Sequence, residues 1–265
     1  MERLSNLFFE LSHEDRLVIL HTLREKPLKL TMIASKMNIS SQEAYRHIQR
    51  LVDSGLVAKT PEGDYKITAY GHQINKLIPG FNVLTNHQDY FKTRDLTLIP
   101  EKFLLRIGEL NNASLLNDVM VTIFDLEVMI REAEEYVCIM LDHMVMNLYK
   151  PMIEATEKGV EIRVMRPQGW RLADEIAEKI GKEVLEKTIS QIRSGKIVQR
   201  EPDIVPVFLA FSEKEVAALS FAKLDGSLDY LGFKSGSEEV HNWCLGLFET
   251  LWDSALPGEV RTRVD

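Results

Sequence analysis

The segment that most constrains the fold is an amphipathic stretch, residues 41–54, whose two ends are both marked. Ser40 followed three positions later by Glu43 is the capping-box pattern that begins a helix. Gly55 is the residue type that most often ends a helix in the left-handed conformation. One apolar stripe predicts a buried face: Ala44, Ile48, Leu51 and Val52. The opposite face is polar and basic: Ser41, Gln42, Tyr45, Arg46, Gln49 and Arg50.

Two more helices are predicted upstream of this segment. Ser12 and Asp15 form a second capping-box pattern, and the amphipathic helix that follows them ends before Pro27. A short helix fits residues 32–37, with Thr31 as its N-cap.

A short β-hairpin is predicted after the third helix. Residues 56–60 and 65–68 have the composition of strands, and residues 61–64 supply the turn. The order helix, helix, turn, helix, hairpin is that of a winged helix-turn-helix unit, which we place over residues 1–78. In such a unit the exposed face of the third helix enters the major groove, where arginine can bond guanine and glutamine can bond adenine. The polar face of residues 41–54 is therefore predicted to contact double-stranded DNA.

Residues 41–57 resemble the recognition helix and first wing strand of the ArsR- and MarR-like winged-helix transcriptional regulators. The resemblance extends to residues 16–24 and 68–71. It implies that Lys59 and Lys66 lie beside the DNA backbone. It also implies which residues face DNA: Ser41, Gln42, Tyr45, Arg46 and Gln49. The acidic wing tip, Glu62 and Asp64, departs from the pattern of the family.

The two cysteines predict neither a metal site nor a disulfide framework. Metal sensors of the ArsR type use cysteines on these helices, and residues 1–80 contain none, so no metal and no cofactor is predicted. Cys138 and Cys244 sit in apolar segments, which is typical of a reducing interior. No apolar run approaches the roughly 20 residues of a membrane-spanning helix. The sequence predicts a cytoplasmic protein with no membrane partner.

Charge is unevenly distributed along the 265 residues. The whole chain holds 32 Lys and Arg against 40 Asp and Glu, a net charge of −8. Residues 1–80 hold 11 basic and 9 acidic residues, a net charge of +2, whereas residues 81–265 hold 21 and 31, a net charge of −10. A polyanion would be repelled by the second part and weakly attracted by the first. The charge therefore permits DNA binding by residues 1–80, with a strong dependence on salt.

Residues 79–121 predict a helical connector. A helix over residues 69–78 is expected to end at Pro79, and further helices fit residues 81–94 and 101–110. Such connectors either carry dimer contacts or pack between domains, and the sequence leaves both open.

From residue 122 onward, helices and strands alternate. Strands at residues 136–141 and 160–165 flank a helix at residues 146–158, which predicts a parallel pair with a right-handed crossover. The remaining elements are helices at residues 124–135, 172–193 and 237–254 and strands at residues 197–200, 205–212, 215–224 and 228–234. The predicted fold class is a winged helix-turn-helix followed by an α/β domain over residues 122–257. A frayed tail is expected at residues 260–265.

Residues 130–141 and 155–165 resemble the core of phospholipase D-like domains, which TrmB-type archaeal regulators also carry in a similar form. Residues 99–103, 228–232 and 243–252 resemble archaeal winged-helix regulators whose effector domain is named for a methanogenesis regulator. This second resemblance spans nearly the whole chain. It implies that residues 122–257 form an effector or dimerisation domain.

The catalytic pattern of phospholipase D-like enzymes is missing. Their reaction needs a nucleophilic histidine with a lysine two positions later, and none of the seven histidines here has one. No phosphate-binding glycine-rich loop, GxSxG elbow or His-Glu-x-x-His zinc motif is present either. The chain is therefore predicted not to be an enzyme, and no catalytic residue is assigned.

Polar residues that follow two neighbouring strands predict a small-molecule site. Asp142 and His143 come directly after the first strand, and Arg166 and Trp170 follow the second. Open α/β sheets bind ligands at the carboxyl ends of their strands. An arginine with an aromatic ring suits an anionic or planar effector. The alternative is that Asp142 caps a helix and Arg166 forms a surface ion pair.

These features predict a dimeric, sequence-specific transcriptional regulator. Two winged helices would bind a roughly palindromic operator, as two-fold symmetry requires, and a small effector would shift their affinity. Two alternatives stay open. One is a protein–protein adaptor whose winged helix binds no DNA, and the other is a hydrolase on a phospholipase D-like fold.

Overall fold

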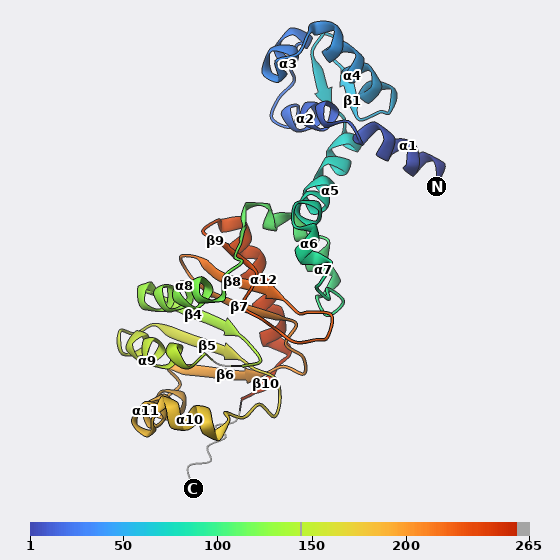
Figure 1. Cartoon of the computed structure of the whole chain (residues 1–265). Coiled ribbons are helices and arrows are strands. Elements are labelled where there is room, and N and C mark those ends of the chain that lie inside the picture. The colour runs from blue at the N-terminus through green and yellow to red at the C-terminus, as the bar shows by residue number, and fades with distance from the viewer. Residues whose placement is uncertain (144, 259–265) are drawn as a thin grey trace. The chain divides into compact units, whose positions relative to one another are not determined.

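The computed structural model describes residues 1–143 and 145–258 (Figure 1). The chain divides into two compact units, Met1–Phe81 and the residues from Asn82 onward. The fold class predicted from the sequence is confirmed, because helices with a two-stranded wing precede a domain of helices and a mixed β-sheet. The domain boundaries at residues 78 and 121 stay predictions. The tail at residues 260–265 lies outside the described residues.

The first unit contains the helices and strands of a winged helix-turn-helix in the predicted order. They are preceded by α1, a helix that the sequence interpretation omits. The elements are α1 (Glu2–Leu11), α2 (Glu14–Thr22), α3 (Leu30–Met37), α4 (Ser41–Asp53), β1 (Val57–Lys59), β2 (Tyr65–Ile67) and α5 (Ala69–Asn86), which begins in this unit. Strands β1 and β2 pair antiparallel and form the predicted hairpin.

Helix α4 begins where its capping box predicts. The Ser40 hydroxyl accepts a hydrogen bond from the Glu43 backbone N–H at 3.2 Å, and Glu43 Oε2 accepts from the Ser40 backbone N–H at 3.1 Å. The hydrogen bonds from Ser40 hold the pKa of the Glu43 carboxyl below its usual value. Ala44, Ile48 and Leu51 are fully buried. Their burial leaves the polar side of α4 facing outward.

The predicted N-cap of α2 is wrong by one residue. The Ser12 hydroxyl donates to the Phe9 carbonyl oxygen at 2.8 Å, because Ser12 closes the end of α1. His13 takes the N-cap position of α2 instead, and its Nδ1 accepts from the Asp15 backbone N–H at 3.3 Å. A helix immediately upstream therefore changed which side chain was available to cap α2.

The second unit is built on a β-sheet. Its helices are α6 (Gln88–Phe91), α7 (Glu101–Leu104), η1 (Ile107–Asn112), α8 (Val119–Glu132), η2 (Met146–Leu148), α9 (Tyr149–Glu157), α10 (Asp174–Ile180), α11 (Lys182–Arg193) and α12 (Glu238–Ser254). Its strands are β3 (Ser114–Leu115), β4 (Tyr136–Met140), β5 (Glu161–Met165), β6 (Ile197–Glu201), β7 (Val207–Ser212), β8 (Val216–Phe221), β9 (Phe233–Ser235) and β10 (Leu256–Pro257).

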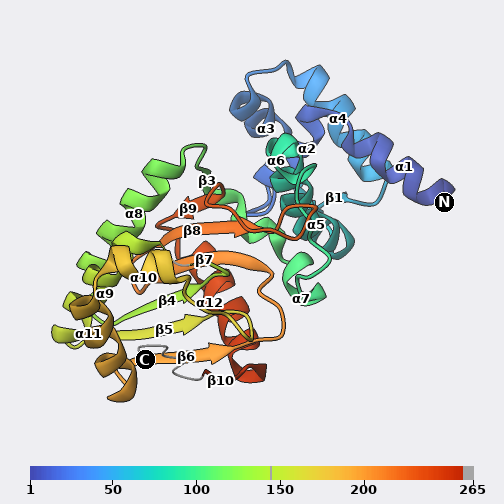
Figure 2. The ribbon, with the colours of Figure 1, turned by 60° about the horizontal axis from the view of Figure 1, so that its bottom comes forward.

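Within the described residues, the sheet has eight strands in the order β10-β6-β5-β4-β7-β8-β9-β3. Strands β4 and β5 are parallel, which confirms the predicted pair, and β6 continues the parallel part beyond β5. The other pairs are antiparallel. Helices α8 to α11 cover one face of the sheet and α12 covers the other (Figure 2). No helix among the described residues is both long and apolar enough to cross a membrane.

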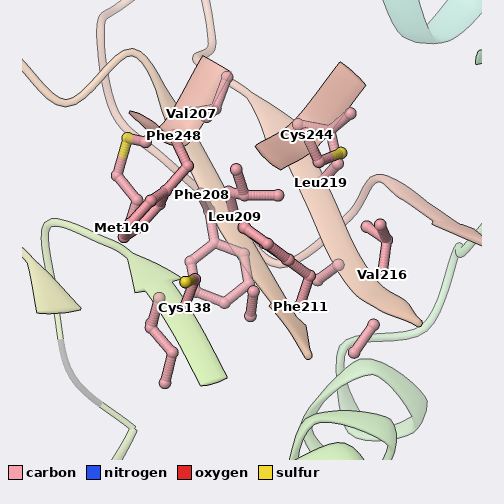
Figure 3. Close-up of a cluster of buried hydrophobic side chains, with 14 of the residues drawn as sticks. Cys138, Met140, Val207, Phe208, Leu209, Phe211, Val216, Leu219, Cys244 and Phe248 are labelled. Atoms are coloured by element: carbon pink, nitrogen blue, oxygen red, sulfur yellow. The ribbon is translucent and has the colours of Figure 1, made fainter. Parts of the chain in front are cut away.

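The core of the second unit is centred on β7 and β8, which are buried along their whole length. A strand can be apolar on both sides only where both faces of the sheet are covered, and here a layer of helices covers each face. Figure 3 shows part of this core, with Cys138 of β4 near Phe211 of β7. Burial raises the pKa of the Cys138 thiol to about 12, so this cysteine stays protonated at neutral pH.

Several helix boundaries differ from the sequence prediction, including those of α8, which spans Val119–Glu132 rather than residues 124–135, and of α7 and η1, which divide the helix predicted over residues 101–110. Helix α3 begins after Lys29 rather than Thr31, because a backbone bridge just before it sets the direction of the chain. Helix α5 continues through Pro79, although a proline inside a helix removes one backbone hydrogen-bond donor and destabilises it. The burial of Val83 in the same helix offsets part of that cost. The helix expected over residues 172–193 is divided into α10 and α11 at Gly181, whose φ of +90° interrupts the helical path.

Arg94, after α6, is held against the sheet by several acceptors. Its side chain is 5% exposed, and Nη1 donates to the Phe221 carbonyl oxygen at 3.0 Å and to Asp229 Oδ1 at 2.9 Å. The same carboxylate accepts from the Ser220 hydroxyl at 2.8 Å and from the Leu231 backbone N–H at 3.1 Å. The strand predicted over residues 228–234 is therefore mostly a turn around this ion pair, and only its end joins β9.

Candidate nucleic-acid interface

Helix α4 presents four of the predicted DNA contacts on one exposed face. Ser41, Gln42, Tyr45 and Arg46 are all exposed, and Tyr45 retains 49% of its accessible surface. Residues four positions apart are neighbours on a helix, so Ser41 lies beside Tyr45 and Gln42 beside Arg46. Arg46 forms no ion pair with any residue that the structure describes. Its guanidinium, with five N–H donors, is therefore available to an external acceptor.

Gln49 and Arg50, which are also predicted DNA contacts, have partners inside the first unit. Gln49 Nε2 donates to Asp53 Oδ1 at 2.8 Å, one turn further along α4. Arg50 Nε donates to Glu10 Oε2 at 3.1 Å, and Arg50 Nη2 donates to the other oxygen of that carboxylate. The Arg50 side chain is still 51% exposed. The six predicted contacts on α4 thus divide into four outward side chains and two that are engaged intramolecularly.

Glu10, at the end of α1, joins three helices. Its side chain is 12% exposed and also accepts from Arg16 Nη1 on α2 at 2.7 Å. Arg16 Nη2 donates to the Phe9 carbonyl oxygen at 3.0 Å, and the Phe9 ring centroid lies 5.6 Å from the Arg50 guanidinium carbon. Sequence reasoning missed this junction because it omitted α1. The signal for α1 was the helical spacing of its apolar residues: Leu4, Leu7, Phe8 and Leu11.

The wing does not bring its two lysines together. Lys59 pairs in register with Tyr65, and Lys66 pairs with Ala58. Because side chains alternate along a strand, Lys59 and Lys66 point to opposite faces of the hairpin. At the tip, its own backbone N–H and the Thr60 hydroxyl hold the pKa of the Glu62 carboxyl below its usual value. The tip is therefore negatively charged at neutral pH, as the departure from the family pattern indicates.

A second group of side chains meets where α2 begins. His47 Nε2 on α4 lies 3.4 Å from Asp15 Oδ2, and His13 Nδ1 lies 3.6 Å from the same oxygen. The centroids of the two imidazole rings are 4.4 Å apart. Imidazoles and a carboxylate are residue types that can hold a metal ion, although the lack of cysteines leads the sequence to predict none. The contact joins two helices, so no local spacing signals it.

In the second unit, Asp142 and His143 lie after β4 and form an ion pair with each other. The hydrogen bond to Asp142 raises the pKa of His143, against the effect of partial burial. Burial acts to raise the pKa of the Asp142 carboxyl, but the hydrogen bond from His143 and its charge outweigh burial and hold this pKa below its usual value. The His143 ring also makes an edge contact with Tyr230, with 4.9 Å between centroids.

Arg166 and Trp170, after β5, come together as predicted. The guanidinium carbon of Arg166 lies 4.8 Å from the centroid of the Trp170 ring. Arg166 Nη2 donates to Gln199 Oε1 at 2.7 Å, and Nε lies 3.9 Å from Glu201 Oε1. Because β4 and β5 are parallel, this pair and the Asp142–His143 pair follow the same edge of the sheet. Each pair already has partners of its own there.

A cavity of about 360 Å³ opens on the helical side of the second unit. Tyr149, Lys150, Arg131 and Glu127 are among its lining residues, together with residues of α10 and α11. None of the four predicted ligand residues lines it. Tyr149, which lines the cavity, lies near enough to Arg166 for the positive charge of Arg166 to favour the ionised form of its hydroxyl. Burial outweighs that charge and raises the pKa of Tyr149 to about 12.

Comparisons with known proteins concern the first unit and the fold as a whole. Residues 11–60 match the model of a helix-turn-helix domain family. A search of curated proteins finds no match to the chain. Among solved structures, the chain is similar to TrmBL2, an archaeal chromatin protein described as showing a novel mode of DNA binding. The identity is 15%, the TM-score is 0.43, and 92% of each chain is covered.

Two further similarities are to solved structures of bacterial proteins. The chain is similar to Nuc of Salmonella typhimurium, a phospholipase D family member, with 10% identity and a TM-score of 0.37 over 51% of this chain and 88% of that one. It is similar to NucT of Helicobacter pylori with 12% identity and a TM-score of 0.40 over 55% and 97%. The geometry of α2 to α4 and the family match agree: residues 11–60 form a helix-turn-helix domain.

Proposed function

We propose that this protein is a sequence-specific DNA-binding transcriptional regulator. The observation that carries the proposal is the outward face of α4 in a helix-turn-helix domain, where Arg46 has no ion-pair partner among the described residues. Gln42 and Arg46 are the residue types that read adenine and guanine edges, and Ser41 and Tyr45 can bond phosphate. Because residues 1–80 carry a net charge of only +2, general attraction to DNA does not select a sequence, and the base contacts of α4 must supply the specificity.

The regulator acts on DNA as a homodimer in this proposal. A single domain covers few base pairs, whereas two copies place two α4 helices in successive major grooves about 34 Å apart. The net charge of −10 over residues 81–265 repels DNA, so it favours contact through the first unit alone.

The second unit binds a small effector in this proposal. Arg166 stacked on Trp170 suits an anionic or planar ligand, and the Asp142–His143 ion pair lies along the same sheet edge. Such a ligand changes DNA affinity only if it binds one arrangement of the dimer better than another. We also propose that the chain has no phosphodiesterase activity, because no histidine is followed two positions later by a lysine.

Selection from a random DNA library by the full chain tests the main proposal. We expect an enriched site with two-fold symmetry, bound with an affinity that falls steeply as salt rises. Sedimentation of the complex should give two protein chains per duplex. If no sequence is enriched at low salt, the adaptor alternative replaces this proposal, and if one chain binds an asymmetric site, the dimer is wrong.

Calorimetry with a panel of anionic and aromatic metabolites tests the effector site. We expect at least one ligand to bind the full chain and to lose affinity in Trp170→Ala, because the indole face is removed while the Arg166 hydrogen bond to Gln199 stays. Tyr70→Ala, which removes an exposed ring from the first unit, is the matched control. Binding that is equal in all three proteins would contradict this assignment of the site. Turnover of a phosphodiester that His143→Ala abolishes would support the hydrolase instead.

A further inference from the structure

We propose that His13, Asp15 and His47 form a binding site for a divalent transition-metal ion such as zinc. One ligand atom from each residue lies within 4.8 Å of the others. Asp15 Oδ2 is central, at 3.4 Å from His47 Nε2 and 3.6 Å from His13 Nδ1. The proposed DNA contacts on α4 do not include these three groups, so an ion could bind them without displacing a predicted base contact.

The donor set selects the kind of ion. Two imidazole nitrogens and one carboxylate oxygen are typical of zinc, cobalt, nickel or copper, whereas calcium and magnesium prefer oxygen ligands alone. Zinc bound tetrahedrally at about 2.0–2.1 Å needs ligand atoms roughly 3.3 Å apart, so both distances to Asp15 already come close. Three protein ligands leave a position for water or another ligand.

The two helices allow the remaining adjustment. The His13 side chain is 47% exposed, so its ring can turn without displacing core residues. Its Nδ1 accepts the N-cap hydrogen bond of α2 at 3.3 Å, and binding an ion through this nitrogen would replace that hydrogen bond. The His47 side chain is 16% exposed and is fixed on α4. Asp15, at 37%, can reach both imidazoles from the first turn of α2. An ion would therefore be held mainly by His47 and Asp15 and closed by His13.

Metal binding would affect the DNA-reading face, and this step rests on the proposed function. His47 follows Arg46 directly on α4, so an ion at the site adds two positive charges beside the residues that face DNA. Added positive charge at that position raises the affinity for a polyanion. The Arg46 and Arg16 charges and the positive N-terminal end of α2 oppose the ion. We therefore expect a dissociation constant on the order of micromolar rather than the tighter values of structural zinc sites.

The test is calorimetry and cobalt absorption spectroscopy on the untagged full chain, with zinc or cobalt chloride as the only ligand. We expect close to one ion per chain with a tetrahedral cobalt spectrum. Asp15→Asn, His13→Gln and His47→Gln should each weaken binding by more than about tenfold, because even changes in the second shell of a metal site cost that much. His21→Gln and His72→Gln remove exposed histidines of the same unit and serve as matched controls.

Two results would overturn the site. One is the absence of zinc binding, and the other is a loss of binding in the His21 or His72 variants that equals the loss in the three site variants. If His47→Gln unfolds, the exposed His13→Gln variant still decides, since a given zinc concentration should raise the melting temperature of this variant less than that of the unchanged chain.

DNA binding is measured separately, with zinc and with a chelator. A gain of roughly threefold or more with zinc that His13→Gln abolishes supports the coupling to α4. Equal DNA affinity in both conditions overturns the coupling. Failure to bind DNA in either condition counts against the proposed function and leaves the metal result standing.

Discussion

Replacing Arg46 with alanine is expected to weaken binding to the selected DNA site by about 1–3 kcal/mol, roughly 5- to 150-fold, the usual contribution of a bidentate arginine–guanine contact. Arg46 is exposed on the outward face of α4, and within the described part of the chain it has no ion-pair partner that its loss would leave behind. Fluorescence anisotropy with a labelled duplex, at one fixed salt concentration, measures the change.

Arg24→Ala is the matched control for this prediction. Arg24 is an exposed arginine beyond the end of α2, so its removal changes the net charge by the same amount without touching α4. We expect it to lower affinity only slightly. If both variants lose the same affinity, and lose it on random DNA as well, then Arg46 contributes only general attraction to phosphate. The proposal that α4 contacts the bases of a specific sequence would then be wrong.

Arg50→Ala is expected to have a smaller effect than Arg46→Ala on DNA binding. The sequence alone treats the two arginines alike. In the structure, part of the Arg50 guanidinium is bound to the Glu10 carboxylate, and its other donors remain on the half-exposed side chain.

Replacing Glu10 with alanine is expected to destabilise the first unit by about 3–5 kcal/mol, the usual cost of removing one partner of a buried ion pair. Arg16 has a side chain that is only 9% exposed, and its Nη1 would lose its acceptor. Arg50 would lose the same carboxylate, but its exposure limits that part of the cost to about 1 kcal/mol or less.

Hydrogen exchange of peptides from residues 1–81 is the appropriate measurement for this variant. Trp170, Trp243 and Trp252 all lie in the second unit, so tryptophan fluorescence would not report the change. We expect faster exchange throughout α1, α2 and α4. Glu14→Ala removes an exposed acid from the start of α2 and should leave exchange nearly unchanged. Protection that is retained in Glu10→Ala would show that α1 is not part of the stable unit.

Local signals were sufficient to predict α4 and its exposed face from sequence. The Ser40–Glu43 capping box, the buried stripe and Gly55 all act within one helix, so no distant contact could override them. The same reasoning failed at Ser12, because its hydroxyl could serve either the helix before it or the helix after it. Which helix the Ser12 hydroxyl caps depends on whether a helix precedes it, and the sequence interpretation does not include α1.

Sequence patterns do not predict which side chains of the site are engaged by contacts with another helix. The pairing of Arg50 with Glu10 and the approach of His47 to Asp15 each join α4 to another helix. Their distances depend on how the helices cross, which periodicity does not specify. Arg166 and Trp170 could be predicted to meet because they follow the same strand, β5, within a few residues.

The anchoring of Arg94 determines where the molecule can be cut for separate study. A fragment that starts at residue 122 would lack Arg94 and Tyr90, so Asp229 would lose its guanidinium donor and the Phe221 amide would lose the Tyr90 hydroxyl oxygen. It would also uncover the apolar surface that Phe103 covers beside Trp243. A fragment that starts near residue 82 keeps all of these groups, so excision of the second unit should begin upstream of α6.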